Sequence, residues 1–242
     1  MLFRSIAAPP HGYGLGEPQD LYVLARRLPA MASSASAGWG SYSMSSDAPV
    51  AAPATSEYPD CMRDLSADVV ARVSAEFVAL RQRVAPRARR VADKSQMHWQ
   101  LVGLARALFP RAGLLHVTRD PTDLLFSLWS NHVGTEHAYP SDLAALGVYW
   151  REYQRLIAHW NTLAPLAEVK YEDVVGAPEA TAKSVIASVG LPWDANVFKF
   201  NDMGRLVSTP SRGRFRQPLD TASIGRSKNY AEFLKPLTDL LK

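Results

Sequence analysis

The sequence predicts an α/β domain built on a parallel sheet with helices on both of its faces. From residue 88 onwards, strand-like segments alternate with segments that have the periodicity of amphipathic helices, which is typical of doubly wound domains. One strand, AGLLHVT at 112–118, is apolar almost throughout, as expected of a strand covered on both sides. At 242 residues, the chain fits one domain with a sizeable core.

The first elements are helical. A helix is predicted near residues 19–28, and a longer one at 65–84 with one buried face made by Val69, Val70, Val73, Phe77 and Leu80. Between them, residues 31–56 are rich in Ala, Ser and Pro and lack apolar periodicity. We expect this segment to be a flexible insertion within the domain.

The alternation follows. A short strand at 88–94 leads into a helix at 98–109, and the apolar strand at 112–118 leads into a helix at 120–132. Ser141 is positioned to cap a long helix from Asp142 to about Thr162. The remaining elements are a strand, AEVKYEDVV at 167–175, and a helix at 177–190 that ends on a glycine.

Composition narrows the classes of function. Residues 1–60 carry net charge −2 and the rest of the chain +6, a modestly basic body without the basic stripe of a nucleic-acid-binding protein. The single Cys61 excludes an intrachain disulfide and gives no metal framework, so we expect no metal. No apolar run approaches the ~20 residues of a membrane span, and Arg4 interrupts the only candidate signal peptide. We expect a cytoplasmic protein; its oligomeric state is left open.

An anion site is predicted where the strand at 112–118 ends. Ligands of open α/β sheets bind at the carboxyl ends of strands, against helix N-termini. Arg119 stands there, Asp120 is a suitable N-cap and Pro121 a suitable first helical residue. Asp123, Ser127, Ser130 and Asn131 form a polar stripe on the helix. A guanidinium with a nearby serine suits a phosphate monoester, although an arginine paired with a carboxylate would show the same pattern.

Several segments in fixed order resemble sulfotransferases that use 3′-phosphoadenosine 5′-phosphosulfate. The segment RDPTDLLFS resembles their R-D-P-x-D-x-x-x-S motif, and VADK, WREYQRLIAHW, VKYEDVVGAPE, GLPWD and STPSRGRFRQPLD…GRSKNY are similar to further family segments. The resemblance covers about residues 1–30 and 58–242, and it is closest to the branch of protein-tyrosine sulfotransferases and bacterial sulfotransferases fused to tetratricopeptide repeats. It implies a P-loop-NTPase-like fold and sulfo transfer to a hydroxyl acceptor. The alternative is a non-catalytic relative that binds a nucleotide or a partner.

The resemblance also implies roles for individual residues. It places Arg119 and Ser127 at the 3′-phosphate, and Asn131 stands where some members of the family have another basic contact. Tyr171 is similar to the tyrosine that lines the adenosine site, and could otherwise be a buried aromatic at a strand end. The C-terminal segment resembles the one in which Ser211 lies near the transferring group and Arg226 contacts the phosphates of the cofactor, but Arg214 and Ser227 depart from the family's Gln and Trp.

Two more positions are similar to the catalytic groups of the family. Glu17, in GLGE, matches the general base of the protein-tyrosine branch, and Lys94 matches the strand-end lysine that stabilises the transition state. His98 and His116 are alternative bases; His116 lies within an apolar strand, which favours a hydrogen-bonded core histidine. Pro18, Gln19 and Asp20 follow Glu17 where the protein-tyrosine branch carries arginines, which argues against an acidic tyrosyl peptide as acceptor.

One part of the family's donor site is not in this sequence. The loop P-R-S-G-T-T-L, which cradles the 5′-phosphosulfate after the first strand, would fall just before Met1, because LFRSIAAPPHGYGLGE resembles the helix and loop that follow it. We therefore expect the first strand of the sheet to be missing, and sulfo transfer by this chain alone to be slow. A shortened chain and a decayed relative both explain this pattern.

Overall fold

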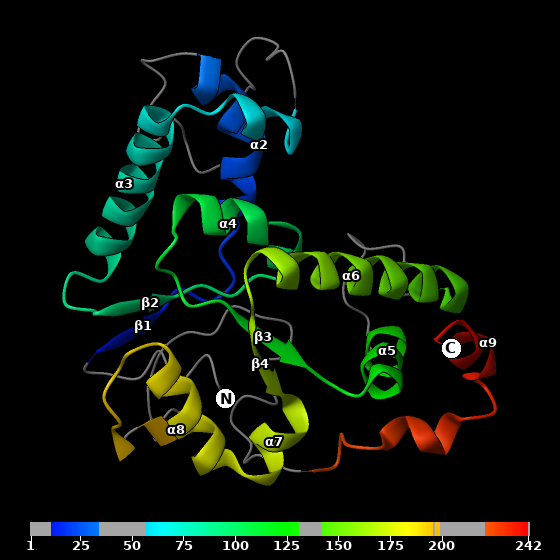
Figure 1. Ribbon diagram of the computed structural model, residues 1–242. Helices are drawn as coiled ribbons and strands as arrows, with labels where there is room; N and C mark the ends of the chain where they lie inside the picture. Colours follow the sequence, from blue (N-terminus) through cyan, green and yellow to red (C-terminus); the bar gives the residue numbers. More distant parts are fainter. Residues whose placement is uncertain (1–10, 34–56, 131–141, 196, 199–220, 242) are drawn as a thin grey trace. The chain divides into compact units, whose positions relative to one another are not determined.

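The structure is a computed structural model that describes residues 11–33, 57–130, 142–195, 197–198 and 221–241 (Figure 1). It is a mixed α/β protein with short pairs of parallel strands. The chain divides into two compact units, here called the N-terminal unit (Ile6–Ala112) and the C-terminal unit (Gly113–Lys242). Each unit is described by itself.

The N-terminal unit is built on one pair of strands. Its elements are β1 (Gly12–Gly14), α2 (Asp20–Ser33), η2 (Asp60–Asp64), α3 (Ala67–Val84), β2 (Arg90–Ala92), η3 (His98–Gln100) and α4 (Val102–Leu108). The strands β1 and β2 are parallel, with Tyr13 opposite Val91. The strand β1 was not foreseen, since the resemblance implied helix and loop in this part of the chain; its pairing with β2 establishes it as a strand. The N–H of Lys94 donates to the carbonyl of Gly16 at 3.1 Å and continues the pairing beyond both strands.

The helices α2, α3 and α4 form the core of this unit. The predicted face of α3 is confirmed: Val73 and Phe77 are buried, and Val69, Val70 and Leu80 pack against the same cluster. The helix α2 is longer than predicted and includes Met31, which is fully buried. The first residues of the segment expected to be flexible are therefore helical, because Met31 completes the apolar face of α2. The rest of that segment, 34–56, lies outside the described residues.

The C-terminal unit is built on the second pair of strands. Its elements are β3 (Leu115–Thr118), α5 (Pro121–Ser130), α6 (Leu143–Leu163), β4 (Ala167–Lys170), α7 (Tyr171–Gly176), α8 (Pro178–Ser188), η7 (Arg226–Tyr230) and α9 (Lys235–Leu240). The strands β3 and β4 are parallel, with Leu115 opposite Ala167 and Thr118 opposite Lys170. Val117 in β3 is 53% exposed, so the prediction that this strand is covered on both faces is wrong.

Two further predictions need correction. A strand was predicted at 167–175, but the strand ends at Lys170 and α7 begins at Tyr171. Glu172 and Asp173 in the first turn of α7 favour a helix N-terminus at this point. The N-cap of α6 is Asp142, whose carboxylate accepts from Ala145 N at 2.7 Å, whereas Ser141 lies outside the described residues.

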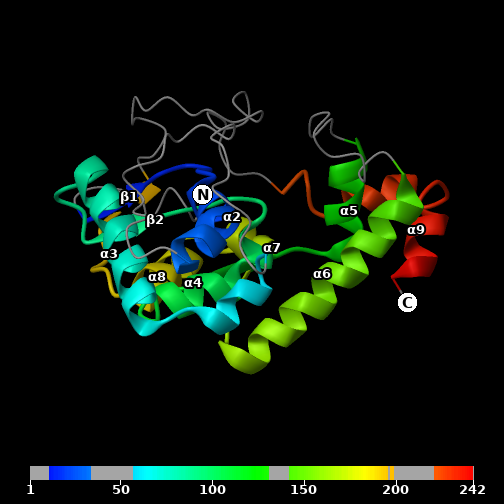
Figure 2. The ribbon, with the colours of Figure 1, turned by 90° about the horizontal axis from the view of Figure 1, so that it is seen from above.

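The helices α5 and α9 lie beside the N-terminal half of α6 (Figure 2). Their shared core is made by Leu125, Phe126, Leu146, Trp150, Leu234 and Leu237, all buried. A Cβ atom at Gly147 would lie 2.6 Å from Leu240 Cδ1 and 3.0 Å from its Cβ, so this glycine allows α9 to approach α6 closely. None of the described helices is long and apolar enough to cross a bilayer.

Candidate functional site

The carboxyl ends of β3 and β4 bring Arg119 and Tyr171 together. Arg119 follows the last residue of β3, and Tyr171 follows the last residue of β4. Because the two strands are parallel and in register, both residues leave the same edge, and the Arg119 guanidinium carbon lies 4.8 Å from the centroid of the Tyr171 ring. Such an arrangement is a favourable cation–π contact. The structure thus brings the two residues into contact, and their role in donor binding stays a prediction.

The turn after Arg119 has the predicted helix-start chemistry. The Asp120 carboxylate accepts from the N–H of Asp123 at 2.9 Å and so caps α5, whose first residue is Pro121. The N–H of Asp120 donates to Glu172 at 3.0 Å, which links this turn to the first turn of α7. These two hydrogen bonds fix the turn after β3, one to the start of α5 and the other to the first turn of α7.

The guanidinium of Arg119 also reaches a distant segment of the chain. Its Nη2 donates to the backbone carbonyl of Ser223, and its Nε is buried and has no hydrogen-bond partner among the described residues. No ion pair joins Arg119 to a carboxylate within the described ranges. Among the described residues, Arg119 is therefore not the strand-end arginine of a surface ion pair, which was the alternative interpretation.

Asp123 is the second link to that segment. The residue is 2% exposed, and its two carboxylate oxygens accept from the backbone N–H groups of Gly225 and, at 2.9 Å, of Ser227. Burial alone would raise the pKa of Asp123, but the hydrogen bonds from Ser227 and Gly225 and the nearby charge of Arg119 outweigh it and lower the pKa below its ordinary value. The carboxylate is therefore ionised at neutral pH.

These links place Arg226 against α5. Arg226 is the first residue of η7, between the two amides that Asp123 holds, and its guanidinium carbon lies 5.7 Å from the centroid of the Phe126 ring. The ring of Tyr230, at the other end of η7, stacks on Phe126 at 4.7 Å. Arg119, Tyr171 and Arg226, separated by up to 107 residues in sequence, thus belong to one region of the C-terminal unit.

The other residues assigned to the donor differ in what the structure says of them. Ser127 lies on α5 one turn after Asp123 and is partly buried. Asn131 and Ser211 lie outside the described residues. The role of all three remains a prediction.

Glu17 and Lys94 meet in the N-terminal unit. Glu17 follows β1 and Lys94 follows β2, so both leave the carboxyl edge of this parallel pair. Lys94 Nζ contacts Glu17 Oε1 in an ion pair, with side chains 49% and 27% exposed. The two residues to which the resemblance gives catalytic roles are therefore direct partners.

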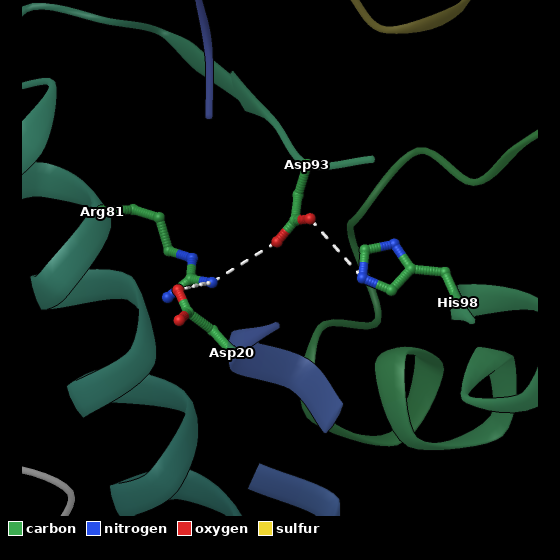
Figure 3. A network of polar contacts seen from close by, with 4 residues as sticks. All are labelled: Asp20, Arg81, Asp93 and His98. Atoms are coloured by element: carbon green, nitrogen blue, oxygen red, sulfur yellow. Dashed lines mark hydrogen bonds and ion pairs between the residues drawn. The ribbon is translucent and has the colours of Figure 1, made fainter. Parts of the chain in front are cut away.

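A partly buried network of polar side chains joins the two segments that carry this pair (Figure 3). Arg81, the last buried residue of α3, donates to Asp20 at 2.9 Å and to Asp93 at 3.4 Å. The other oxygen of Asp93 faces His98 Nε2 at 3.5 Å. Burial raises the pKa of Asp93, although His98 and Arg81 oppose it; burial likewise lowers the pKa of His98, opposed by Asp93. His98 is therefore neutral at neutral pH.

His116, the other alternative base, is a hydrogen-bonded residue of β3, as expected. Its Nε2 contacts the hydroxyl of Tyr153 on α6, and burial lowers its pKa. Within the described ranges, no three His, Cys, Asp or Glu side chains are arranged to hold a metal ion.

The sequence did not single out two of the residues that organise these sites. Asp123 was assigned only to a polar stripe on the helix, but an aspartate between the apolar residues of α5 was itself a sign of a buried carboxylate. Arg81 continues the 73–77–81 spacing of the buried face of α3, and a charged residue at such a position requires a partner. The partners, 61 and 104 residues away, could not be read from the spacing.

Comparison with known proteins identifies the family of the chain. Residues 17–195 match the model of a family described as "Sulfotransferase family". The chain is also similar to an uncharacterized protein of Aquifex aeolicus (strain VF5), with 25% identity over 158 residues, which is 63% of this chain and 21% of that protein. The chain thus spans about a fifth of the length of this relative. Because the family model covers well over half of the sequence, from Glu17 through both strand-end sites, the chain belongs to the sulfotransferase family.

Proposed function

We propose that this protein transfers a sulfo group from 3′-phosphoadenosine 5′-phosphosulfate to a hydroxyl acceptor. Membership of the sulfotransferase family supports sulfo transfer in general terms. The observation that carries the choice of donor is the pair Arg119–Tyr171 at the carboxyl ends of β3 and β4, beside the segment that carries Arg226. In a phosphorylated nucleoside, the phosphate is the part that cations bind, and the base is the part that an aromatic ring contacts.

The residues fit such a nucleotide chemically. A guanidinium binds a phosphate monoester through charge-assisted hydrogen bonds, and Arg119 and Arg226 supply two of them. The buried Nε of Arg119 lacks a partner among the described residues, which indicates that its guanidinium has unused hydrogen-bonding capacity. Ser127 and Asn131 would add a hydroxyl and an amide to the 3′-phosphate end, and the Tyr171 ring would contact the adenosine.

The donor would supply an activated sulfo group, and the chain's own residues would manage proton and charge. Glu17 would accept the proton of the acceptor hydroxyl at its carboxylate, and Lys94 would place its positive charge at the leaving phosphate, with Ser211 near the transferring group. Glu17 and Lys94 now neutralise each other. Lys94 must therefore leave Glu17 before either side chain can act.

The acceptor class follows from the residues after Glu17. Asp20 is committed to Arg81 at 2.9 Å, and no basic residue follows Glu17 in the segment 18–20. An acidic peptide would find no cation in this segment to bind it, which leaves hydroxyl acceptors such as carbohydrates, lipids or phenols.

Binding of 3′-phosphoadenosine 5′-phosphate, measured by calorimetry, tests the donor assignment. We expect the chain to bind this nucleotide and to bind adenosine 5′-phosphate, which lacks the 3′-phosphate, at least about tenfold more weakly, since a charge-assisted hydrogen bond contributes ~1.5–3 kcal/mol. Equal affinity for both would reject the proposed 3′-phosphate site.

Transfer is tested with labelled donor and a panel of carbohydrate, lipid and phenol acceptors. Turnover that is lost in Glu17→Gln supports the proposed base. Binding of the nucleotide without turnover, by this chain and by a version extended with a strand and the loop P-R-S-G-T-T, would favour the alternative of a non-catalytic nucleotide-binding relative.

A further inference from the structure

The buried carboxylate of Asp123 holds a turn that does not belong to its own helix. Asp123 lies in the first turn of α5, yet its hydrogen bonds go to the backbone N–H groups of Gly225 and Ser227, 102 and 104 residues later. A carboxylate that is 2% exposed must be compensated, and these two amides, the Ser227 hydroxyl and the charge of Arg119 compensate it.

The turn so held has a conformation that needs support. Gly225 has φ +70°, in the left-handed region, and is the N-cap of η7. Gly225 has no side chain that could accept a hydrogen bond from the first turn of η7. Asp123 therefore supplies from another element the acceptor that a short 3-10 helix lacks at its start.

The residue between the two held amides is Arg226. Fixing the N–H groups on either side of it fixes the position of its Cα, and its guanidinium then rests over Phe126. A second contact, from Arg119 to the Ser223 carbonyl, holds the same turn two residues earlier. The turn therefore brings its cation to the region of Arg119 by way of Asp123.

We infer that Asp123 is a positioning residue for anion binding: it touches no ligand, but places Arg226 for the phosphate groups of the nucleotide. This inference rests on the proposed function. It assigns to a negative charge a role that favours the binding of an anion. A negative charge near the site, acting only through space, would repel the phosphate, so its removal would tighten binding. Positioning predicts the opposite sign.

The experiment is calorimetry of 3′-phosphoadenosine 5′-phosphate with Asp123→Asn. This isosteric change removes the charge and places a side-chain amide N–H opposite one of the two backbone N–H donors. We expect binding at least about tenfold weaker than in the parent, matching Arg226→Ala, because one charge-assisted contact is lost in each. The double variant Asp123→Asn/Arg226→Ala should bind no more weakly than Arg226→Ala alone.

The matched control is Asp120→Asn, which removes a carboxylate from the same turn, where asparagine is an equally good N-cap. It should bind the nucleotide as well as the parent does. If Asp123→Asn does not fold, Gly225→Ala decides: Asp123 is untouched, a Cβ at Gly225 would meet nothing closer than 3.7 Å, and only the left-handed backbone is strained. It should also weaken binding about tenfold, and parental affinity would overturn the inference.

The outcomes separate the two proposals. If the parent binds the nucleotide and Asp123→Asn binds equally well or better, the positioning role is wrong and the donor site stands. If Asp123→Asn and Arg226→Ala are fully additive, Asp123 acts on the fold and not through Arg226, which also rejects the inference. If the parent does not bind the nucleotide, the donor assignment fails and the inference fails with it.

Discussion

Arg81 donates a hydrogen bond of 2.9 Å to Asp20, and the same nitrogen lies 3.4 Å from Asp93. Asp20 begins the helix that follows Glu17, and Asp93 directly precedes Lys94. One arginine on α3 therefore joins the two segments that carry the Glu17–Lys94 pair. Its guanidinium also lies 3.3 Å from the centroid of the Phe77 ring, so its stem and its charge are both used in the core.

Replacing Arg81 with Met should destabilise the protein by about 3 kcal/mol, because it leaves two partly buried carboxylates without their cation. Urea unfolding followed by circular dichroism measures this. The matched control is Arg63→Met, which removes an ion pair to Asp60 whose side chains are 83% and 67% exposed, and which should cost less than about 1 kcal/mol. Similar costs for the two variants would mean that the network does not stabilise the N-terminal unit.

His98 makes stability depend on pH in a defined direction. Burial beside Arg81 holds its pKa below the ordinary value of about 6.5, whereas in the unfolded chain His98 protonates normally. The unfolded state therefore binds more protons below pH ~6.5, and the free energy of unfolding falls as the pH is lowered through that point. The loss is at most about 1.4 kcal/mol per pH unit. Asp93, with its raised pKa, acts in the opposite direction at lower pH.

The test compares urea unfolding at pH 7.5 and 6.0 for the parent, His98→Gln and His159→Gln. His98→Gln should lose less stability than the parent over this interval, because its amide does not titrate. His159, exposed on α6, controls for the removal of a histidine. Identical losses for the two variants would show that protonation of His98 is not opposed by the fold.

Arg119 should not be replaceable by lysine. Its guanidinium lies over the Tyr171 ring and donates to the Ser223 carbonyl at the same time, which a point-like ammonium cannot reproduce. Both Arg119→Lys and Arg119→Ala should weaken binding of 3′-phosphoadenosine 5′-phosphate, the alanine variant by about 2 kcal/mol. Calorimetry with the exposed Arg155→Ala as control measures the difference, and full affinity in Arg119→Lys would mean that charge alone suffices.

Local patterns predicted the elements that depend on neighbouring residues. The spacing of Val73 and Phe77 identified the buried face of α3, and Asp120 with Pro121 identified the start of α5, because periodicity and capping act within a few residues. The strand β1 escaped prediction because Gly12–Gly14 has no strand pattern of its own and depends on pairing with residues about 78 positions later. Tyr171 lay within the segment predicted as a strand through residue 175, whereas the acidic Glu172 and Asp173 that follow it favour a helix start.

The candidate site likewise has a part that neighbouring residues predict and a part that depends on distant ones. Arg119 could be found because it stands between an apolar strand and a helix start, and its role could be inferred from resemblance. The tie from Asp123 to Gly225 could not, since a hydrogen bond between residues 102 apart leaves no periodic trace in one sequence. Long-range polar contacts therefore separate the predictable part of this molecule from the part that required a structure.

The contact between α6 and α9 gives a prediction about packing. A Cβ at Gly147 would lie 2.6 Å from Leu240 Cδ1, closer than carbon atoms can approach, so Gly147→Ala should destabilise the protein by about 1–3 kcal/mol through overpacking, despite the better helix propensity of alanine. Gly176→Ala is the control: nothing lies within 4 Å of its added Cβ, and it should be neutral or slightly stabilising.

Leu240→Ala alone should also destabilise, since it opens a cavity against α6. In the double variant Gly147→Ala/Leu240→Ala the new methyl group occupies space that the leucine left, so the two costs should sum to more than the measured loss, by at least about 0.5 kcal/mol. Urea unfolding of the parent, the two single variants and the double variant gives the cycle. Additive losses would show that α9 does not pack on Gly147 in solution, because two residues that share no contact have no reason to compensate each other.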